Sequence, residues 1–184
     1  FYNKIKIFSF NIFIQSVKMK KAIVEISEGL GNQLFMYANA YSFSKKKGYH
    51  LFIDSKSAYK KLKIRSFMLE NMNIDIKDAK PSEIPDNLFK NINFKIHRKL
   101  DYFRKNKRFL VEHKLKDKRT RFKDYTNENY SDKVYIKGYF ESEKYFINYK
   151  NDIINQFKIK NLSENTLCIN PSKIKNENSI SIAI

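Results

Sequence analysis

The sequence predicts an α/β domain, in which helices pack against a parallel β-sheet, and three observations lead to this fold class. A short apolar run, KAIVEI at residues 21–26, precedes a turn with two glycines and then a helical pattern. Another apolar run, at residues 50–53, follows that pattern directly, and VYIKGYF at residues 134–140 again has a helical pattern behind it. Strands that alternate with helices favour a parallel sheet with right-handed crossovers.

The first strand, the helix after it and the second strand form one βαβ unit. The helix is expected over residues 32–47, because its apolar side chains recur at helical spacing and the three lysines that end it suit the negative end of a helix dipole. Gly48 can then adopt the left-handed conformation that commonly ends a helix. The apolar face of the helix carries Leu34, Phe35, Ala38 and Tyr41.

The later elements are less regular. Residues 81–85 hold two prolines and form a break, and residues 92–122 alternate apolar and basic positions in a way compatible with a helix. A strand over residues 134–140 is expected to lead into a helix over residues 142–157. Residues 161–177 are predicted to form a polar connector.

Composition and charge limit the class of protein. A length of 184 residues suits one domain, or one domain and part of a second, and 42% hydrophobic residues are enough for a core. Of the formal net charge of +18, much lies between Lys95 and Lys123, where thirteen basic residues stand against three acidic ones. This stretch suits a solvated helical face, an acidic membrane surface or a phosphate-bearing ligand. Because lysine is abundant along the whole chain, nucleic acid is not expected as a partner.

Cysteine and histidine usage predicts no metal cofactor. Cys168 is the only cysteine, which excludes an intrachain disulfide and a cysteine-based zinc site and suits a reducing cytoplasm. His50, His97 and His113 are too scattered to predict a cluster of ligands. No apolar run reaches the about 18 residues of a membrane span. We therefore expect a cytoplasmic protein, with peripheral contact at the inner face of the cell membrane.

The turn between the first strand and the helix carries the strongest chemical signal. Gly29 and Gly31 lie between a strand and a helix N-terminus, where backbone N–H groups lack partners and the helix dipole favours an anion. Glycine also lets a phosphate approach the main chain closely. Asn32 and Gln33 add two amide side chains that can donate to phosphate or sugar oxygens.

Three interpretations of this turn stay open on residue types alone. A dinucleotide site would need G-x-G-x-x-G and an acid about 20 residues later. Gly29, Gly31 and Asp54 fit that scheme, but Leu34 stands where the third glycine should be. The turn could instead bind another phosphate-sugar ligand, or it could join strand to helix without any ligand. The phosphate-loop pattern G-x-x-x-x-G-K-[ST] is absent from the sequence.

Two longer motifs carry a family resemblance. Residues 23–48, IVEISEGLGNQLFMYANAYSFSKKKG, resemble the opening of glycosyltransferase family 11, the bacterial α-1,2-fucosyltransferases, which have a short strand and then G-G-L-G-N-Q-[LM]-F-x-Y-A. Glu28 replaces the first glycine of that pattern. GYFESEKYF, at residues 138–146, resembles the family's G-Y-F-Q-S-x-x-Y-F. Two motifs in the right order and spacing are far more specific than one glycine turn.

The resemblance implies both a fold and an activity. The fold is the N-terminal, acceptor-side domain of a GT-B glycosyltransferase, in which two Rossmann-like domains face a cleft. The activity is an inverting, metal-independent transfer of fucose from GDP-fucose to the 2-hydroxyl of a galactose in a surface glycan such as lipopolysaccharide. The partners would then be GDP-fucose, a galactose-terminated glycan and an acidic membrane surface.

The resemblance also suggests where the substrates bind. The residues expected to contact the donor are Gly29, Gly31, Asn32 and Gln33. Glu141 and Ser142 lie at a strand-to-helix turn and could meet the acceptor or the nucleotide, although Ser142 also suits a helix N-cap. No carboxylate stands out as the general base, and Asp54 at a strand end is a weak candidate.

The end of the sequence departs from the family's pattern. There, a motif like S-[IV]-S-[IV]-H-x-R-R-G-D is associated with stabilising the diphosphate, whereas here SISI at residues 179–182 is followed only by Ala183 and Ile184. We expect residues 1–18 to be an upstream extension, residues 19–170 the N-terminal domain, and residues 171–184 a linker and the first strand of a truncated donor-binding domain. The chain alone should then have little transferase activity. Two alternatives remain: a fragment of a dinucleotide-binding enzyme, and a basic module that binds membrane or nucleic acid.

Overall fold

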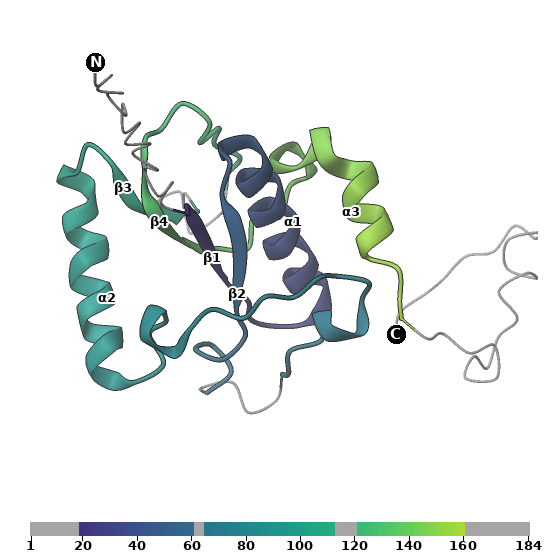
Figure 1. The fold of residues 1–184 in the computed structure, drawn as a ribbon, viewed down its shortest axis with the longest axis horizontal. Coiled ribbons are helices and arrows are strands. Elements are labelled where there is room, and N and C mark those ends of the chain that lie inside the picture. Colours follow the sequence, from purple (N-terminus) through teal and green to yellow (C-terminus); the bar gives the residue numbers. More distant parts are fainter. Residues whose placement is uncertain (1–18, 61–64, 113–120, 161–184) are drawn as a thin grey trace, which may run out of the picture.

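A four-stranded parallel sheet forms the centre of the protein. The computed structural model describes residues 19–60, 65–112 and 121–160. The strands are β1 (Lys21–Glu25), β2 (His50–Asp54), β3 (Lys107–Val111) and β4 (Tyr130–Lys137), in the spatial order β2-β1-β4-β3 (Figure 1). Each neighbouring pair is parallel. The prediction of an α/β fold with a Rossmann-like parallel sheet is therefore confirmed.

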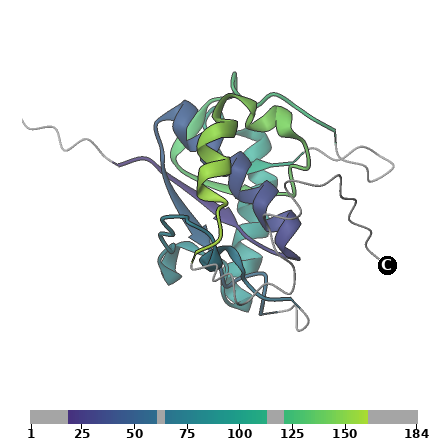
Figure 2. The same cartoon turned by 90° about the vertical axis from the view of Figure 1, so that its right-hand side faces the viewer.

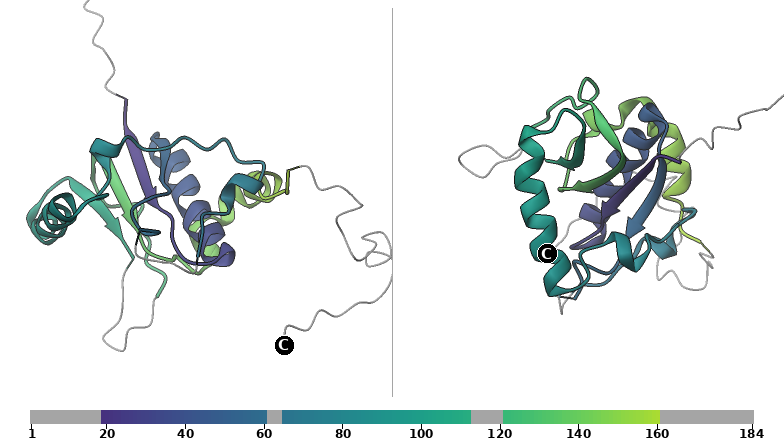
Figure 3. Two further views of the ribbon diagram at one scale, coloured as in Figure 1. Left: turned by 90° about the horizontal axis from the view of Figure 1, so that it is seen from below. Right: turned by 60° about the vertical axis from the view of Figure 1, so that its left-hand side comes forward.

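Helices cover both faces of this sheet. They are α1 (Leu30–Lys47), α2 (Leu88–Leu100) and α3 (Lys150–Gln156). Helices α1 and α3 lie side by side on one face, and α2 lies on the other (Figures 1 and 3). Figure 2 views the molecule from the side of α1 and α3, with the sheet behind them. Among the described helices, none has the length and apolar character needed to cross a membrane.

The alternation of side chains along the central strands explains the two layers. Val24 and Ile136 are fully buried in the core beneath α1, whereas their neighbours Ile23 and Tyr135 face the other way, towards α2. Phe94 of α2 closes that second core by edge-to-face contact with Tyr135, at 5.0 Å between ring centroids. Each such aliphatic side chain contributes about 1.5–3 kcal/mol of hydrophobic stabilisation when it is fully buried.

Helix α1 closely follows the sequence prediction. It begins at Leu30, two residues before the expected start, with Gly29 as N-cap, and it ends at Lys47 as expected. Gly48 adopts the left-handed conformation, with φ of 70°, and donates its N–H to the carbonyl of Ser44. This left-handed glycine cap confirms the predicted end of the helix.

Two expected helices are wrong in extent. The helix pattern over residues 92–122 gives α2, which ends at Leu100, and then strand β3. The reason is Asp101, whose buried carboxylate accepts hydrogen bonds from the backbone N–H groups of Arg108 and Phe109, at 2.8 and 3.0 Å. The helix expected over residues 142–157 is instead two 3-10 turns followed by the short α3.

Strand β4 also ends earlier than predicted, at Lys137, because Gly138 and Phe140 have positive φ values of 149° and 54°. Residues 1–18 and 161–184 lie outside the described residues. The predictions for the upstream extension, the connector, Cys168 and the final strand are therefore not addressed by the structure.

Candidate functional site at the carboxyl edge of the sheet

The order of the strands indicates where a ligand would bind. Helix α1 follows β1 and covers one face, whereas α2 follows β2 and covers the other. The connection after β1 leads to β2 on one side of it, and the connection after β2 leads to β3 on the other side. The point where the strand order reverses therefore lies between β1 and β4, which are adjacent in the sheet. In open parallel sheets, ligands bind outside the carboxyl ends of the strands at such a switch point.

A pocket of about 370 Å³ occupies this position. Its walls come from the ends of β1, β3 and β4 and from α2. The polar side chains and turn residues around it include Glu25, Ser27, Glu28, Arg98, Glu112 and Tyr139. A second hollow of about 310 Å³ shares Glu25, Arg98 and Lys137 with it and extends along α2. Together the two hollows form one polar site at the switch point.

The glycine turn forms one wall of this site and is held in an unusual conformation. Glu28 has φ of 64°, in the left-handed region that favours glycine. Its carbonyl oxygen accepts hydrogen bonds from Gln33 Nε2 at 2.8 Å and from the hydroxyl of Tyr59 at 3.3 Å. Glu28 stands where the fucosyltransferase pattern has glycine, so the backbone explains why glycine would suit that position.

The N-terminus of α1 offers unpaired backbone donors beside this turn. Gly29 provides no side-chain cap, and the first turn of the helix holds no acidic residue. A β-carbon at Gly29 would lie 3.6 Å from Nη1 of Arg65, so that guanidinium lies over the turn. Nothing stands within 4 Å of a β-carbon at Gly31. The helix N-terminus and Arg65 therefore bring positive potential to one point.

The two amides of the motif have different surroundings. Asn32 is half-buried, and its side chain has no hydrogen-bond partner among the described residues. Gln33 is fully buried: its Nε2 donates to the carbonyls of Glu28 and Ser66, and its Oε1 accepts from the N–H of Met68 at 2.9 Å. Asn32 is thus free to meet a ligand, whereas Gln33 ties the turn to residues 66–68.

Asp54 and Glu25 belong to a polar network below the pocket. The hydroxyl of Tyr135 lies 2.6 Å from Asp54 Oδ2 and 3.1 Å from Glu25 Oε2, and Lys137 pairs with Glu25. Asp54 Oδ1 also accepts from the N–H groups of Lys56 and Ser57. Burial, followed by the two carboxylates, raises the pKa of Tyr135 and keeps the phenol protonated. Asp54 is therefore engaged within the protein on both oxygens.

The second motif reaches the same pocket through Gly138 and Tyr139. A β-carbon at Gly138 would lie 2.3 Å from Cβ of Glu112. The Glu112 carboxylate accepts from the N–H groups of Tyr139 and Phe140, at 2.8 and 2.9 Å. Only glycine fits so close an approach, and the buried carboxylate holds the loop in place.

Several predicted site residues do not line the carboxyl-edge pocket. The four residues expected to contact the donor lie at the start of α1, and none of them is among its lining residues: Gly29, Gly31, Asn32 and Gln33. The structure does not bring Glu141 or Ser142 into the carboxyl-edge pocket. Glu141 is exposed, and Ser142 begins a 3-10 turn without a side-chain capping bond. Phe140 and Tyr145 are buried in the core. Tyr139 is partly buried: it packs against the core and also lines the pocket.

Two contributors, Arg65 and Glu112, were missed by sequence reasoning. Neither belongs to a motif, and neither is close in sequence to the turn that it contacts. The part of the chain that the structure describes contains no group of His, Cys, Asp and Glu that could hold a metal ion.

The fold and site define a Rossmann-like α/β domain with a polar pocket at its switch point. Comparison with family models, curated proteins and solved structures finds no match.

Proposed function

We propose that this chain is the acceptor-side domain of a GT-B glycosyltransferase that resembles the family 11 α-1,2-fucosyltransferases. Its donor would be GDP-fucose and its acceptor the 2-hydroxyl of a terminal galactose, without a metal. One observation carries the proposal: the two segments that hold the motifs, far apart in sequence, meet at the same pocket. Ser27 and Glu28 come from the first motif region, and Gly138 and Tyr139 from the second.

The geometry supports binding of a phosphate-bearing donor at the first motif. Backbone N–H groups at the start of α1 point out of the helix, and Arg65 lies over Gly29. A guanidinium remains charged and can grip phosphate oxygens in two places. Asn32 adds a free amide. Stabilising the negative charge of a departing diphosphate is the main demand of this reaction, besides positioning the acceptor hydroxyl.

The acceptor would occupy the side of the pocket nearer Tyr139 and Arg98, since these side chains offer an aromatic face and hydrogen-bond donors. The carboxylates of Glu25 and Glu112 are engaged by Lys137 and by backbone N–H groups. These bonds hold the walls of the pocket in place, so they position the substrate rather than react with it.

A nitrogen-15 NMR titration of the chain with GDP-fucose, GDP and NAD tests the proposal. GDP-fucose should shift the amides of Gly29, Gly31 and Tyr139, and replacing Asn32 by alanine should weaken binding about tenfold, equivalent to ~1.4 kcal/mol. Lys45→Gln is the control, because Lys45 is exposed on the same helix and contacts the ring of Tyr41 instead of the pocket. Tighter binding of NAD than of GDP-fucose would favour the dinucleotide alternative and refute the proposal.

A second observation favours a membrane surface as a further partner. Helix α2 directs Phe94 towards the sheet but leaves a stripe of apolar side chains exposed on its other side. The stripe consists of Leu88, Ile92, Ile96 and Leu100, with Phe89 beside it at 84% exposure. Tyr102 and Phe103 continue it beyond the helix. A helix of this kind can lie in the interface of a bilayer.

The charge around the stripe supports an acidic lipid surface as that partner. Lys95 and Lys99 lie on the same helix, and Arg104, Lys105 and Arg108 follow it. The acid within this stretch, Asp101, is buried and bonded to backbone N–H groups. Each basic residue near an anionic leaflet contributes about 1 kcal/mol. Peripheral contact with the inner face of the cell membrane would bring the enzyme to a lipid-linked acceptor.

Co-sedimentation with vesicles tests this surface. Binding to vesicles that contain phosphatidylserine should exceed binding to neutral vesicles and fall as salt rises. Ile96→Ser should weaken it about tenfold, because one buried aliphatic side chain is worth roughly 1.5–3 kcal/mol. Ile154→Ser on α3 is the matched control, since Ile154 and Ile96 are both 52% exposed. Equal loss in both variants, or equal binding to DNA, would contradict a membrane role for α2.

A further inference from the structure

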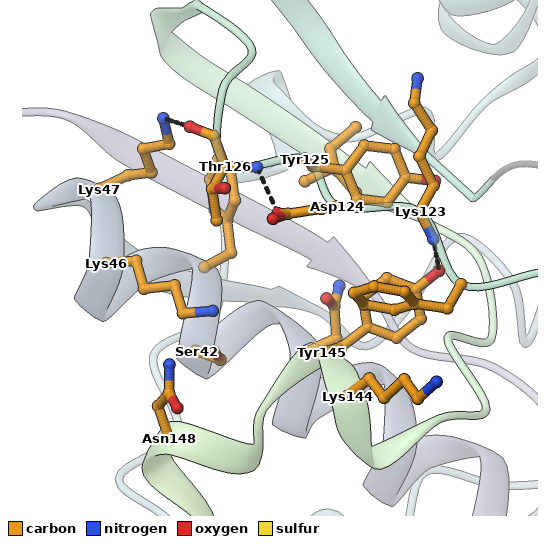
Figure 4. Close-up of a pocket in the computed structure, with 14 residues that line it drawn as sticks. Ser42, Lys46, Lys47, Lys123, Asp124, Tyr125, Thr126, Lys144, Tyr145 and Asn148 are labelled. Carbon is orange, nitrogen blue, oxygen red and sulfur yellow. Dashed lines mark hydrogen bonds between the residues drawn. The ribbon is translucent and has the colours of Figure 1, made fainter.

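A separate pocket lies along the C-terminal half of α1, at the other end of the helix from the glycine turn. It has a volume of about 220 Å³ and is enclosed by α1, by residues 122–126 and by the turn around Tyr145 (Figure 4). Because α1 runs back along the sheet from the carboxyl ends of the strands, this half of the helix is remote from the carboxyl-edge pocket. The two pockets share no lining residue.

The floor of this pocket contains two buried polar groups without partners. Asn39 and Ser42 are 4% and 0% exposed, and both line the cavity. Neither Nδ2 of Asn39 nor Oγ of Ser42 has a hydrogen-bond partner among the described residues. Leaving such a group unsatisfied costs about 1–3 kcal/mol, so it needs an explanation. A ligand with oxygen atoms would supply the missing partners.

The opening of the pocket is predominantly basic. Lysines 46, 47, 123 and 144 line it, against the one acid Asp124. Lys47 is bonded to the carbonyl of Thr126, and Lys123 to Glu128 at 2.8 Å. Figure 4 shows Lys46 extending into the space between Ser42 and Asp124. Lys46 is thus the cation that a ligand in this pocket would meet first.

Asp124 stays ionised and can accept hydrogen bonds from a ligand. The N–H of Thr126 donates to its Oδ1 at 2.9 Å, and this bond, aided by Lys46 and Lys47, lowers the pKa of the carboxyl. The remaining wall is aromatic: the rings of Phe122 and Tyr145 lie 4.9 Å apart at their centroids. An aromatic wall, a carboxylate and amide or hydroxyl donors are groups that bind the faces and hydroxyls of a sugar ring.

We propose that this pocket binds a small phosphorylated sugar. The sugar ring would lie against the aromatic wall, its hydroxyls would meet Asn39, Ser42 and Asp124, and its phosphate would pair with Lys46. The volume is below the roughly 300–1,000 Å³ of pockets for drug-sized ligands, so a single ring fits it and a nucleotide does not. The site is independent of the proposed transfer reaction, because it uses none of the residues of the carboxyl-edge pocket.

An NMR titration with glucose 6-phosphate, inorganic phosphate and glucose tests this inference. Glucose 6-phosphate should shift the side-chain amide of Asn39 and the backbone of Ser42 in a saturable way, and bind about tenfold more tightly than either of the other probes, a difference of ~1.4 kcal/mol. Lys46→Gln should remove that advantage over glucose. Asn39→Leu should abolish binding while leaving the melting temperature unchanged or higher, because it removes an unsatisfied buried donor.

Ser44→Ala is the matched control. Ser44 lies two residues from Ser42 on α1, is 4% exposed and has an unpartnered hydroxyl, but it does not line the pocket. Its replacement should leave binding unchanged. The inference is overturned if no probe gives a saturable shift at Asn39 or Ser42, if Lys46→Gln binds as tightly as the original chain, or if Ser44→Ala weakens binding as much as Ser42→Ala. The binding of GDP-fucose at the carboxyl-edge pocket is tested by its own titration and does not depend on this result.

Discussion

Replacing Glu28 by glycine should stabilise the protein, and the size of the effect can be worked out from the backbone. Glu28 has φ of 64°, and the left-handed conformation costs a residue with a side chain about 1–2 kcal/mol. Glycine avoids that cost but loses about 0.5–1 kcal/mol more in chain entropy on folding. The expected net gain in the free energy of unfolding is therefore about 0–1.5 kcal/mol, with a midpoint of ~0.75 kcal/mol. The hydrogen bonds to the Glu28 carbonyl remain available to either residue.

Urea unfolding followed by circular dichroism measures this difference. Glu28→Ala is the control, since alanine removes the charge but keeps the β-carbon that the left-handed conformation penalises. If Glu28→Ala stabilises the protein as much as Glu28→Gly does, the charge and not the backbone is responsible, and the reasoning is refuted. Glu28→Gly should also tighten GDP binding, because it removes a negative charge from beside the start of α1.

Three further predictions concern stability. Gly138→Ala should lower the free energy of unfolding by about 3 kcal/mol or more, because its β-carbon would meet Glu112 at 2.3 Å; an unchanged urea midpoint would contradict this close approach. Gln33→Ala should cost about 2–4 kcal/mol, since it leaves buried backbone groups without partners; a loss no larger than that of Asn32→Ala would refute the role assigned to Gln33. Burial, opposed by a hydrogen bond from Gln33, raises the pKa of Tyr59 to about 12. The phenol of the unfolded chain ionises first, near pH 10. The stability that the protonated Tyr59 contributes to the folded chain is therefore complete below about pH 10 and is lost as the pH rises towards 12. The free energy of unfolding, measured across that pH range, should fall less steeply for Tyr59→Phe than for the unchanged chain.

Much of the first half of the fold was predictable because its signals are local. The strand before the glycine turn, helix α1 and its left-handed cap at Gly48 all depend on residues close together in sequence. The second half was predicted less well. The helical pattern after residue 92 continues past Leu100, but the Asp101 carboxylate bonds to backbone N–H groups seven and eight positions later and supports an edge strand instead.

The candidate site shows the same division. Gly29, Gly31 and Asn32 could be predicted to form a turn at a helix N-terminus, because strand, glycines and helix follow one another directly. Gln33 directly follows Asn32, but consecutive residues of a helix point in different directions. Asn32 is therefore only half-buried, whereas Gln33 is buried against residues 66–68.

By itself, the sequence determined that this protein has a parallel α/β sheet, a glycine turn at a helix N-terminus and two motifs that resemble a fucosyltransferase. Those features depend on periodicity and on short motifs, which neighbouring residues encode. Only the tertiary structure decided that segments from both motif regions share one pocket, that Glu112 lines it, that Arg65 lies over Gly29, and that Asn39 and Ser42 line a separate cavity. The physical reason is that strand order and helix packing bring together side chains that no local pattern relates.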